Sequence, residues 1–459
     1  MTKRVLSGIG CSLAALACCI GLYNGGSLDT TEVASATLAP LADLEEEGSF
    51  STSFTNTDGS VQFFVNIPQS EPDSQMPKVY VRPHYLTGED ARRVAEALFP
   101  EAEFFEAVRE LAVDSGAPIY SKAEIQAKLD RWAPYATQEA LDELLGETGR
   151  ERVDVVQSFL VKYTEMYDHA PVDNPHKVCT WELRKESEKL DANDVVFARF
   201  FVDGIPYRFT ASVRNKADFK VSNLSCYIYD GRSPLTLDDK IFRARLCRTA
   251  APTDEQVAAV RERAQELLDS FGLGQWQIAR CEAKSSQCGI HTEHTIWLEA
   301  VPVLGGVPAL LQPQRLALRN LQGEFMGHYL TSAEFVFAPN GELLSFNLYT
   351  PLDVQRVERV EDSGMTMQQI MSMAQEQLVT TGPGRYGWYF HENVKCNVFL
   401  EDIHYGLTRM DLPGEDAYVY VPAASLWGVS EYMWDFDGEP FYQNERDSNF
   451  LTIPFSNQT

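Results

Sequence analysis

The stretch 295–349 constrains the fold more than any other part of the chain, because it contains two β-hairpin patterns in succession. In the first pattern an apolar run turns at Gly305-Gly306, and in the second an apolar run turns at Asn340-Gly341. A two-residue turn that matches the twist of its strands needs positive φ at its centre, which glycine and asparagine adopt most easily. The stretch therefore predicts two successive antiparallel hairpins.

Other stretches supply helices and further strands. Apolar periodicity predicts helices over 87–98, 121–132, 137–166, 253–271 and 366–379. Thr253 and Thr366 are each followed three residues later by a glutamine, which is the spacing of a capping box. Alternation with period two predicts strands over 61–67, 78–82, 178–183, 195–202, 206–213, 219–229, 395–412, 417–427, 432–442 and 450–455. The order of these patterns predicts an α+β fold, with a helical N-terminal part followed by antiparallel β-sheet units that are each preceded by a helix.

One short motif recurs in the predicted β-regions, at 202–207, 304–309 and 436–441. It places a turn pair ending in glycine after an apolar residue, and a proline two residues beyond the glycine, which favours a strand edge because proline lacks an amide hydrogen. The motifs are too irregularly spaced for a solenoid. We divide the chain into a signal peptide or membrane anchor over 1–23, a disordered linker over 24–60, a helical and then β-sheet unit over 61–250, and two helix-plus-sheet units over 251–459.

Charge limits the partners that the protein can have. The chain has 459 residues and a formal net charge of -27. Such an acidic surface repels nucleic-acid phosphates and anionic lipid headgroups. We therefore expect no nucleic-acid partner, and contact with a membrane only through the N-terminal segment.

The N-terminus indicates export. Lys3 and Arg4 precede an almost uncharged run that ends near Tyr23, which is the pattern of a signal sequence. Three outcomes are open: cleavage after the Ala-Ser-Ala at 34–36, retention as a membrane anchor, and lipidation at Cys18 or Cys19. The residues before Cys18 and Cys19 do not form a clean lipidation motif. All three outcomes place the folded part outside the cytoplasm, either secreted or anchored to the cell membrane by its N-terminus.

The remaining cysteines agree with export. Six of them follow the targeting segment, an even number that allows 15 pairings: Cys179, Cys226, Cys247, Cys281, Cys288 and Cys396. An oxidising compartment favours disulfides, and among the possible pairs Cys281 with Cys288 closes the shortest loop. The alternative is that some of the six are reduced and buried as small hydrophobic residues.

Several motifs together resemble known exported proteins. The segments 201–207 and 301–309 resemble the hairpins of small PepSY-type helix-plus-sheet modules. The last third is similar to an uncharacterised family, a domain of unknown function, of exported and often lipid-anchored proteins of Gram-positive bacteria. This resemblance rests on the stretches 333–343, 344–351 and 418–428, with additional support from 85–91 and 95–99. It implies an envelope location, and it carries no assigned activity, cofactor or catalytic residue.

Residues with metal-ligand chemistry gather in one place. Zinc accepts thiolates and imidazoles, and Cys281, Cys288, His291 and His294 lie within fourteen residues of one another. Their spacing is not that of a zinc finger, and the compartment favours a disulfide, so we predict surface histidines and no metal at Cys288, His291 and His294. The glycine pattern over 382–387 follows a helix and contains a proline, so it predicts a loop. Asp435 to Glu439 could begin a calcium loop, but Asp437-Gly438 fits a hairpin turn better.

Function follows from these patterns only in outline. We predict no catalytic residue and no cofactor, and our leading hypothesis is a non-catalytic protein of the cell envelope that binds or regulates another envelope protein or a glycan. One alternative is a secreted hydrolase with an acidic or Cys/His site, because sequence spacing does not give the distance between two carboxylates. The other is a carbohydrate-binding surface, which requires the aromatic residues around Trp427 and Trp434 to be exposed rather than in the core.

Overall fold

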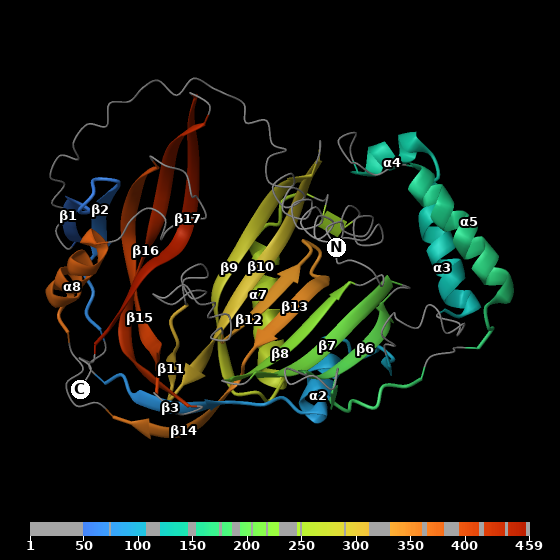
Figure 1. Ribbon diagram of the computed structural model, residues 1–459, viewed down its shortest axis with the longest axis horizontal. Coiled ribbons are helices and arrows are strands. Elements are labelled where there is room, and N and C mark those ends of the chain that lie inside the picture. The colour runs from blue at the N-terminus through green and yellow to red at the C-terminus, as the bar shows by residue number, and fades with distance from the viewer. Residues whose placement is uncertain are drawn as a thin grey trace, which may run out of the picture.

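The computed structural model is organised as two large β-sheets joined at one end (Figure 1). It describes residues 49–72, 75–106, 120–145, 153–173, 177–185, 193–202, 205–216, 219–228, 246–247, 250–288, 291–311, 331–359, 365–380, 394–412, 417–436 and 439–455. The N-terminal segment, with Cys18 and Cys19, and the glycine pattern over 382–387 lie outside these ranges.

The seven-stranded sheet combines strands from both ends of the chain. Its order is β1-β2-β15-β16-β3-β14, and β17 also pairs with β16. The pairs are antiparallel except β2 with β15, which run parallel. Its strands are β1 (Ser49–Thr55), β2 (Val61–Pro68), β3 (Lys78–Pro83), β14 (Leu352–Glu358), β15 (Lys395–Asp411), β16 (Tyr418–Phe436) and β17 (Glu439–Pro454).

The ten-stranded sheet is built from the middle of the chain and is antiparallel throughout its described pairs. Its order is β11-β10-β12-β13-β8-β7-β6-β4, with β9 also paired to β10 and β5 to β6. Its strands are β4 (Phe105–Glu106), β5 (Arg184–Lys185), β6 (Asn193–Val202), β7 (Ile205–Lys216), β8 (Phe219–Ile228), β9 (Gln275–Cys288), β10 (His291–Leu304), β11 (Val307–Pro308), β12 (Ser332–Phe337) and β13 (Leu343–Tyr349).

Four of the described helices begin at a capping box. The described helices are α2 (Gly88–Leu98), α3 (Lys122–Trp132), the 3-10 turn η2 (Ala133–Tyr135), α4 (Gln138–Leu145), α5 (Val153–His169), α7 (Asp254–Ser270) and α8 (Met367–Val379). Thr253 with Gln256 and Thr366 with Gln369 form the predicted capping boxes, so both predictions are confirmed. Each box satisfies amide groups that have no partner inside the helix.

The predicted fold class is wrong. The described part of the protein is mostly β, with two large sheets and few helices, rather than α+β with one helix before each sheet unit. The N-terminal part is also not helical from its start, because it begins with β1, β2 and β3. Local periodicity detected most strands, but it could not show that strands far apart in sequence share a sheet. Helices cover the faces of these sheets and do not mark the start of separate units.

The predicted boundaries change with the topology. β1 lies within the linker expected over 24–60, so the folded part begins before Val61. Both sheets contain strands from each side of the boundary at residue 250. The parts 61–250 and 251–459 are therefore not separate structural units. None of the helices that the structure describes combines the length and the apolarity needed to cross a membrane.

The predicted hairpins are confirmed. Gly305 and Gly306 have φ values of 60° and 87° and join β10 to β11, and Gly341, with φ 86°, lies in the turn between β12 and β13. The recurring motif joins antiparallel neighbours in all three places, with Val202 opposite Ile205, Leu304 opposite Val307 and Phe436 opposite Glu439. β11 is only a short partner, however, and β10 pairs over its length with β9.

Three apolar cores hold the sheets together. Helices α2 and α7 pack on one face of the ten-stranded sheet, where Phe200, Phe335 and Phe346 are fully buried. Helix α8 packs on the seven-stranded sheet over a second core. A third core joins the sheets, with Val79 and Tyr420 from one and Val301 from the other. The sheets therefore share buried surface in addition to the chain that links them.

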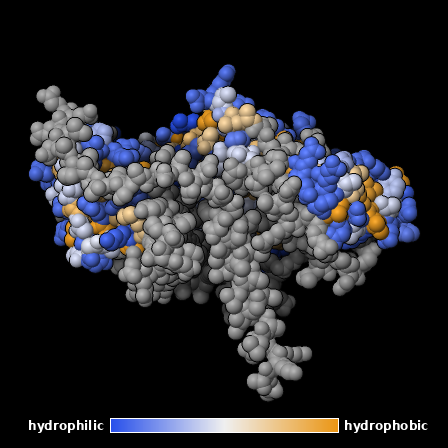
Figure 2. Space-filling view, turned by 90° about the horizontal axis from the view of Figure 1, so that it is seen from above, coloured by the Kyte–Doolittle hydropathy of each residue, from blue (hydrophilic) through white to orange (hydrophobic). Residues whose placement is uncertain are grey.

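A separate group of helices, α3 to α5, lies at the right of Figure 1 and has a core of its own. Its centre holds Lys128, which is 1% exposed and lies 5.1 to 5.6 Å from the ring centroids of Tyr120, Trp132 and Tyr163. Aromatic faces attract a cation, which offsets part of the cost of burying it. Apolar side chains also reach the surface of this group, as the orange patches at the right of Figure 2 show.

Candidate functional site

The structure brings together only part of the Cys/His group, because Cys288 and His291 lie opposite each other on β9 and β10 whereas Cys281 lies elsewhere on β9. Cys281 and Cys288 lie on the same strand, β9, which is extended over Gln275–Cys288. Seven residues of extended strand separate their Cα atoms by about 23 Å, whereas a disulfide needs about 7 Å or less. The predicted Cys281–Cys288 disulfide is therefore wrong. His291 lies opposite Cys288, and His294 Nδ1 lies 2.9 Å from Ser285 Oγ, so the histidines are far from Cys281.

The other cysteines are placed in the cores. Cys179, Cys226 and Cys247 are buried in the core beneath α2 and α7, and Cys396 is buried beneath α8. Within the described ranges, no two cysteines lie within disulfide distance, and no three side chains of His, Cys, Asp or Glu are grouped as metal ligands. Burial raises the pKa of the Cys226 thiol, which makes it unreactive.

The aromatic residues of the last strands divide between core and surface. Tyr432 is buried, whereas Trp427 is half-buried and stacks on the exposed His404 with ring centroids 5.1 Å apart. The Trp427 indole N–H donates to Ser425 Oγ at 2.9 Å. The side chain of Trp434 lies outside the described residues. Asp435 lies in β16, which forms a hairpin with β17. The segment is therefore a hairpin, as predicted, rather than the start of a calcium loop.

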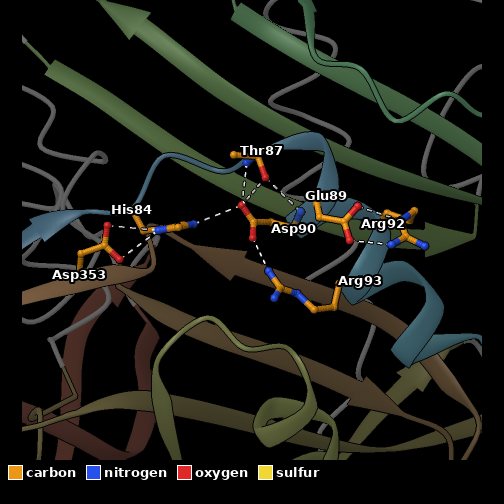
Figure 3. Close-up of polar contacts among 7 residues, drawn as sticks. All are labelled: His84, Thr87, Glu89, Asp90, Arg92, Arg93 and Asp353. Carbon is orange, nitrogen blue, oxygen red and sulfur yellow. Dashed lines mark hydrogen bonds and ion pairs between the residues drawn. The ribbon is translucent and has the colours of Figure 1, made fainter.

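One polar cluster lies where the chain crosses between the sheets (Figure 3). His84 follows β3, and its Nδ1 lies 3.0 Å from Asp353 Oδ1 at the start of β14, while its Nε2 lies 3.2 Å from Asp90 Oδ2 on α2. The His84 amide donates to the Pro351 carbonyl at 2.7 Å. The imidazole therefore connects the two segments that cross between the sheets, one from β3 to α2 and one from β13 to β14. Only its protonated form can donate hydrogen bonds to both carboxylates at once.

Asp90 is the centre of this cluster. Its side chain is 8% exposed, accepts from the Thr87 amide and hydroxyl at 2.8 and 2.7 Å, and pairs with the Arg93 guanidinium. Burial opposes ionisation of this carboxyl, but the hydrogen bonds from Thr87 and His84 outweigh it and hold the pKa of Asp90 below its ordinary value. The arrangement caps α2 and joins the crossovers, so it explains stability and offers no open position for a ligand.

A second polar feature runs across the ten-stranded sheet, on the face opposite α2 and α7. Six polar residues from consecutive strands lie opposite one another in a single line, which we call the polar row. In order from β9 to β7 they are Arg280, Glu299, Glu334, Asn347, Ser225 and Thr210. Their chain neighbours, such as Leu298, Phe335 and Phe346, are fully buried in the opposite core, which fixes the row on the other face.

The polar row is buried to an unusual degree. Glu299 is 4% exposed, and Glu334, Asn347, Ser225 and Thr210 are half-buried. Glu299 and Glu334 lie directly opposite each other, an arrangement of like charges that destabilises a sheet. Polar side chains are normally found on exposed surface, so a buried polar row needs an explanation.

The electrostatics of the row follow from this burial. Burial raises the pKa of the Glu334 carboxyl, although Lys284 partly opposes the shift. Burial, with the nearby Glu334, raises the pKa of Tyr349 to about 12. Partial loss of solvent likewise lowers the pKa of Lys284, whose side chain is still 48% exposed and whose ammonium lies 3.6 Å from the centre of the Trp297 ring. The neutral forms of these groups are thus easier to populate than on an open surface.

Several buried polar atoms on this face make no hydrogen bond within the described ranges. Thr210 Oγ1, Asn223 Oδ1 and Ser332 Oγ are buried and make no hydrogen bond in the part of the chain that the structure describes. Asn223 and Ser332 both lie opposite Tyr349, in the line of residues next to the polar row. Native proteins satisfy nearly all buried polar groups, so these unsatisfied atoms distinguish this face from an ordinary sheet surface.

The polar row was not predicted from the sequence. Its residues come from six strands and are scattered over 210–347, so no local motif contains them. The local pattern from Ala333 to Phe337 does place Glu334 on the face opposite the buried residues Ala333 and Phe335. The same pattern is found in any half-exposed strand, so it does not indicate a site. Only the pairing of strands shows that the alternating polar positions form one line.

Comparison with known proteins does not show which family the chain belongs to. No protein-family model matches the chain, and no curated protein matches it significantly. The resemblance to exported Gram-positive proteins therefore stays a prediction.

Proposed function

We propose that the protein is an exported, non-catalytic binding protein of the cell envelope, secreted or held at the membrane by its N-terminal segment. The targeting pattern at the N-terminus supports export, and the acidic net charge of -27 is consistent with a role that does not involve nucleic acid. The observation that carries the binding role is the polar row, beside which Asn223 Oδ1 and Ser332 Oγ are buried and make no hydrogen bond to any described residue. The partner is a component of the envelope, either a protein or a glycan.

Two measurements on the full chain test this proposal. After expression in a Gram-positive host, we expect protease added outside intact cells to degrade the protein, or the culture medium to contain it, while a cytoplasmic marker stays intact. We also expect saturable binding of the purified protein to isolated cell envelopes, without release of soluble fragments. A protein protected inside intact cells, or one that does not bind envelopes, would contradict the proposal.

A second candidate is a secreted hydrolase with an acidic site, and the opposed Glu299 and Glu334 favour it. Two neighbouring carboxyl groups whose environments separate their pKa values can divide the roles of acid and base, and burial raises the pKa of Glu334. Release of soluble sugars or peptides from the same envelopes, abolished in Glu334→Gln, would support the hydrolase. Binding without release supports the non-catalytic protein.

A further inference from the structure

We propose that the outer edge of β1 pairs with β1 of a second copy of this chain, so that two seven-stranded sheets join into one continuous sheet. The inference concerns assembly and does not depend on the proposed binding function. It rests on three features of β1: its place in the sheet, its sequence and the way its side chains pack.

β1 is the last strand at one end of the seven-stranded sheet, at the left of Figure 1. Among the described strands it pairs with β2 alone, and its register with β2 runs without a shift along its whole length. Ser51, Ser53 and Thr55 on this strand are exposed to solvent. About half of the backbone amides and carbonyls of an edge strand point away from its neighbour, so such an edge can pair with another strand.

β1 lacks the features that usually protect a sheet edge, which are charged side chains, proline and β-bulges. β14, at the opposite end of the same sheet, has the exposed charges Asp353 and Arg356 and a register shift beside Val354. β1 has no charged residue, no proline and no such shift. The stretch 49–68 contains one charged residue, Asp58, although 23% of the chain is charged. Local repulsion between two copies of this acidic protein is therefore small at this edge.

The sequence of β1 is complementary to itself in the antiparallel direction. On both sides of Thr52 a serine comes first and a phenylalanine second. A two-fold axis at Thr52 places Phe50 of one copy opposite Phe54 of the other. It likewise places Ser51 opposite Ser53. Aromatic pairs and pairs of hydroxyl side chains both stabilise antiparallel strands, so one symmetric register suits all five positions.

The packing of the two phenylalanines shows what a second copy adds. Phe50 and Phe54 lie on the face of the sheet that packs under α8, and both are only half-buried there. Phe54 stacks on Phe63 of β2 with ring centroids 4.9 Å apart, and β1 has no described strand on its other side. A two-fold axis perpendicular to the sheet keeps this face on the same side in both copies. The phenylalanines of the second copy therefore continue the core and cover apolar surface that is exposed in one copy alone.

Sedimentation velocity of the purified full-length chain, over about 1 to 100 µM, tests the inference. We expect a dimer with a dissociation constant in the micromolar range, because a single pair of edge strands is a small interface. The double variant Ser51→Lys/Ser53→Lys places lysine opposite lysine twice in the dimer. It should raise the dissociation constant at least about 10-fold. The double variant Ser51→Glu/Ser53→Lys instead places glutamate opposite lysine twice, and it should keep the dimer.

The matched control is Gln62→Lys/Asn66→Lys, which adds the same charge at exposed positions on β2, one strand away from the edge. Like the two edge variants, it removes the hydrogen bond between Ser51 and Asn66. It should dimerise like the wild type, and circular dichroism should show that all three variants keep the fold. Because added lysines reduce the net negative charge, dissociation of the double-lysine edge variant cannot come from overall repulsion.

Three results would show that the inference is wrong. The first is a wild type that stays monomeric over the whole concentration range. The second is a dimer that the double-lysine edge variant leaves unchanged, which would place the interface elsewhere. The third is equal dissociation of the double-lysine and the glutamate–lysine edge variants, which would exclude the register centred on Thr52.

Discussion

In the seven-stranded sheet, the face turned away from the core exposes polar side chains on β2, as at Gln62 and Asn66, and buries neutral polar side chains on β15 and β16, as at Asn397 and Ser425. The corresponding face of the ten-stranded sheet buries a charged group as well, at Glu299. Both sheets use the same local pattern, with alternating apolar and polar residues and helices over the apolar face. The difference teaches that alternation fixes which residues share a face, whereas their surroundings decide whether that face is open surface or a candidate site.

Phe346 and Asn347 compare the two faces of the ten-stranded sheet directly, because they are neighbours on β13. Phe346 is fully buried between Phe271, at the end of α7, and Phe335. We expect Phe346→Ala to lower the free energy of unfolding by about 3–5 kcal/mol, through lost burial and a cavity. Asn347→Ala should change it by less than about 1 kcal/mol.

Urea unfolding monitored by tryptophan fluorescence and by circular dichroism measures both changes. A loss for Asn347→Ala as large as that for Phe346→Ala would show that the polar row is structural core. In that case the two faces would not differ in the way that we infer.

The polar cluster of His84, Asp90 and Asp353, which we call the crossover cluster, tests how the two sheets are joined. Asp90→Asn removes the charge that Thr87, His84 and Arg93 stabilise, and should lower the free energy of unfolding by about 1–2 kcal/mol at pH 7. Because the pKa of Asp90 lies below its ordinary 3.8 in the folded chain, this stability is present above pH 3.8 and is lost as the pH falls through the folded value.

The pH profile distinguishes this mechanism from a change in packing. The difference in unfolding free energy between wild type and Asp90→Asn should be constant near neutral pH and shrink below pH 3.8. Glu89→Gln on the same turn is the control, since Glu89 is exposed and pairs only with its helix neighbour Arg92 in the described contacts. We expect no measurable change in that variant. A difference for Asp90→Asn that stays the same down to pH 2 would contradict the electrostatic explanation.

The smallest expected effect concerns the urea concentration at which each sheet unfolds, where we expect no difference between the two sheets. Cys226 and Cys396 are each 1% exposed, one in the core of each sheet. Because the sheets share the core that contains Val79 and Val301, we expect them to unfold together. Pulses of N-ethylmaleimide at increasing urea, read by mass spectrometry, should label both thiols over the same concentration range.

Cys281 provides the internal reference for that experiment. It is half-buried on β9, so it should react before the protein unfolds. Two separate transitions for Cys226 and Cys396 would show that the sheets are independent folding units, despite the shared core and the crossover cluster.

Part of the fold was accessible from the sequence. The turns at Gly305-Gly306 and Asn340-Gly341 were predicted because positive φ is a local requirement that few residues meet. The capping boxes at Thr253 and Thr366 were predicted because their partners lie three residues away. The candidate site was not predicted, since no short motif contains Glu334 together with Thr210.

The sequence by itself determined the turns, the helix starts and most strand positions, because each depends on residues close together in the chain. Only the tertiary structure decided that β2 pairs in parallel with β15, and that Cys281 and Cys288 share one strand and cannot bond. It also decided that Glu299 and Glu334 lie opposite each other in a buried row. The physical reason is that strand pairing is non-local: many registers satisfy the same alternation, and the burial of the whole sheet selects among them.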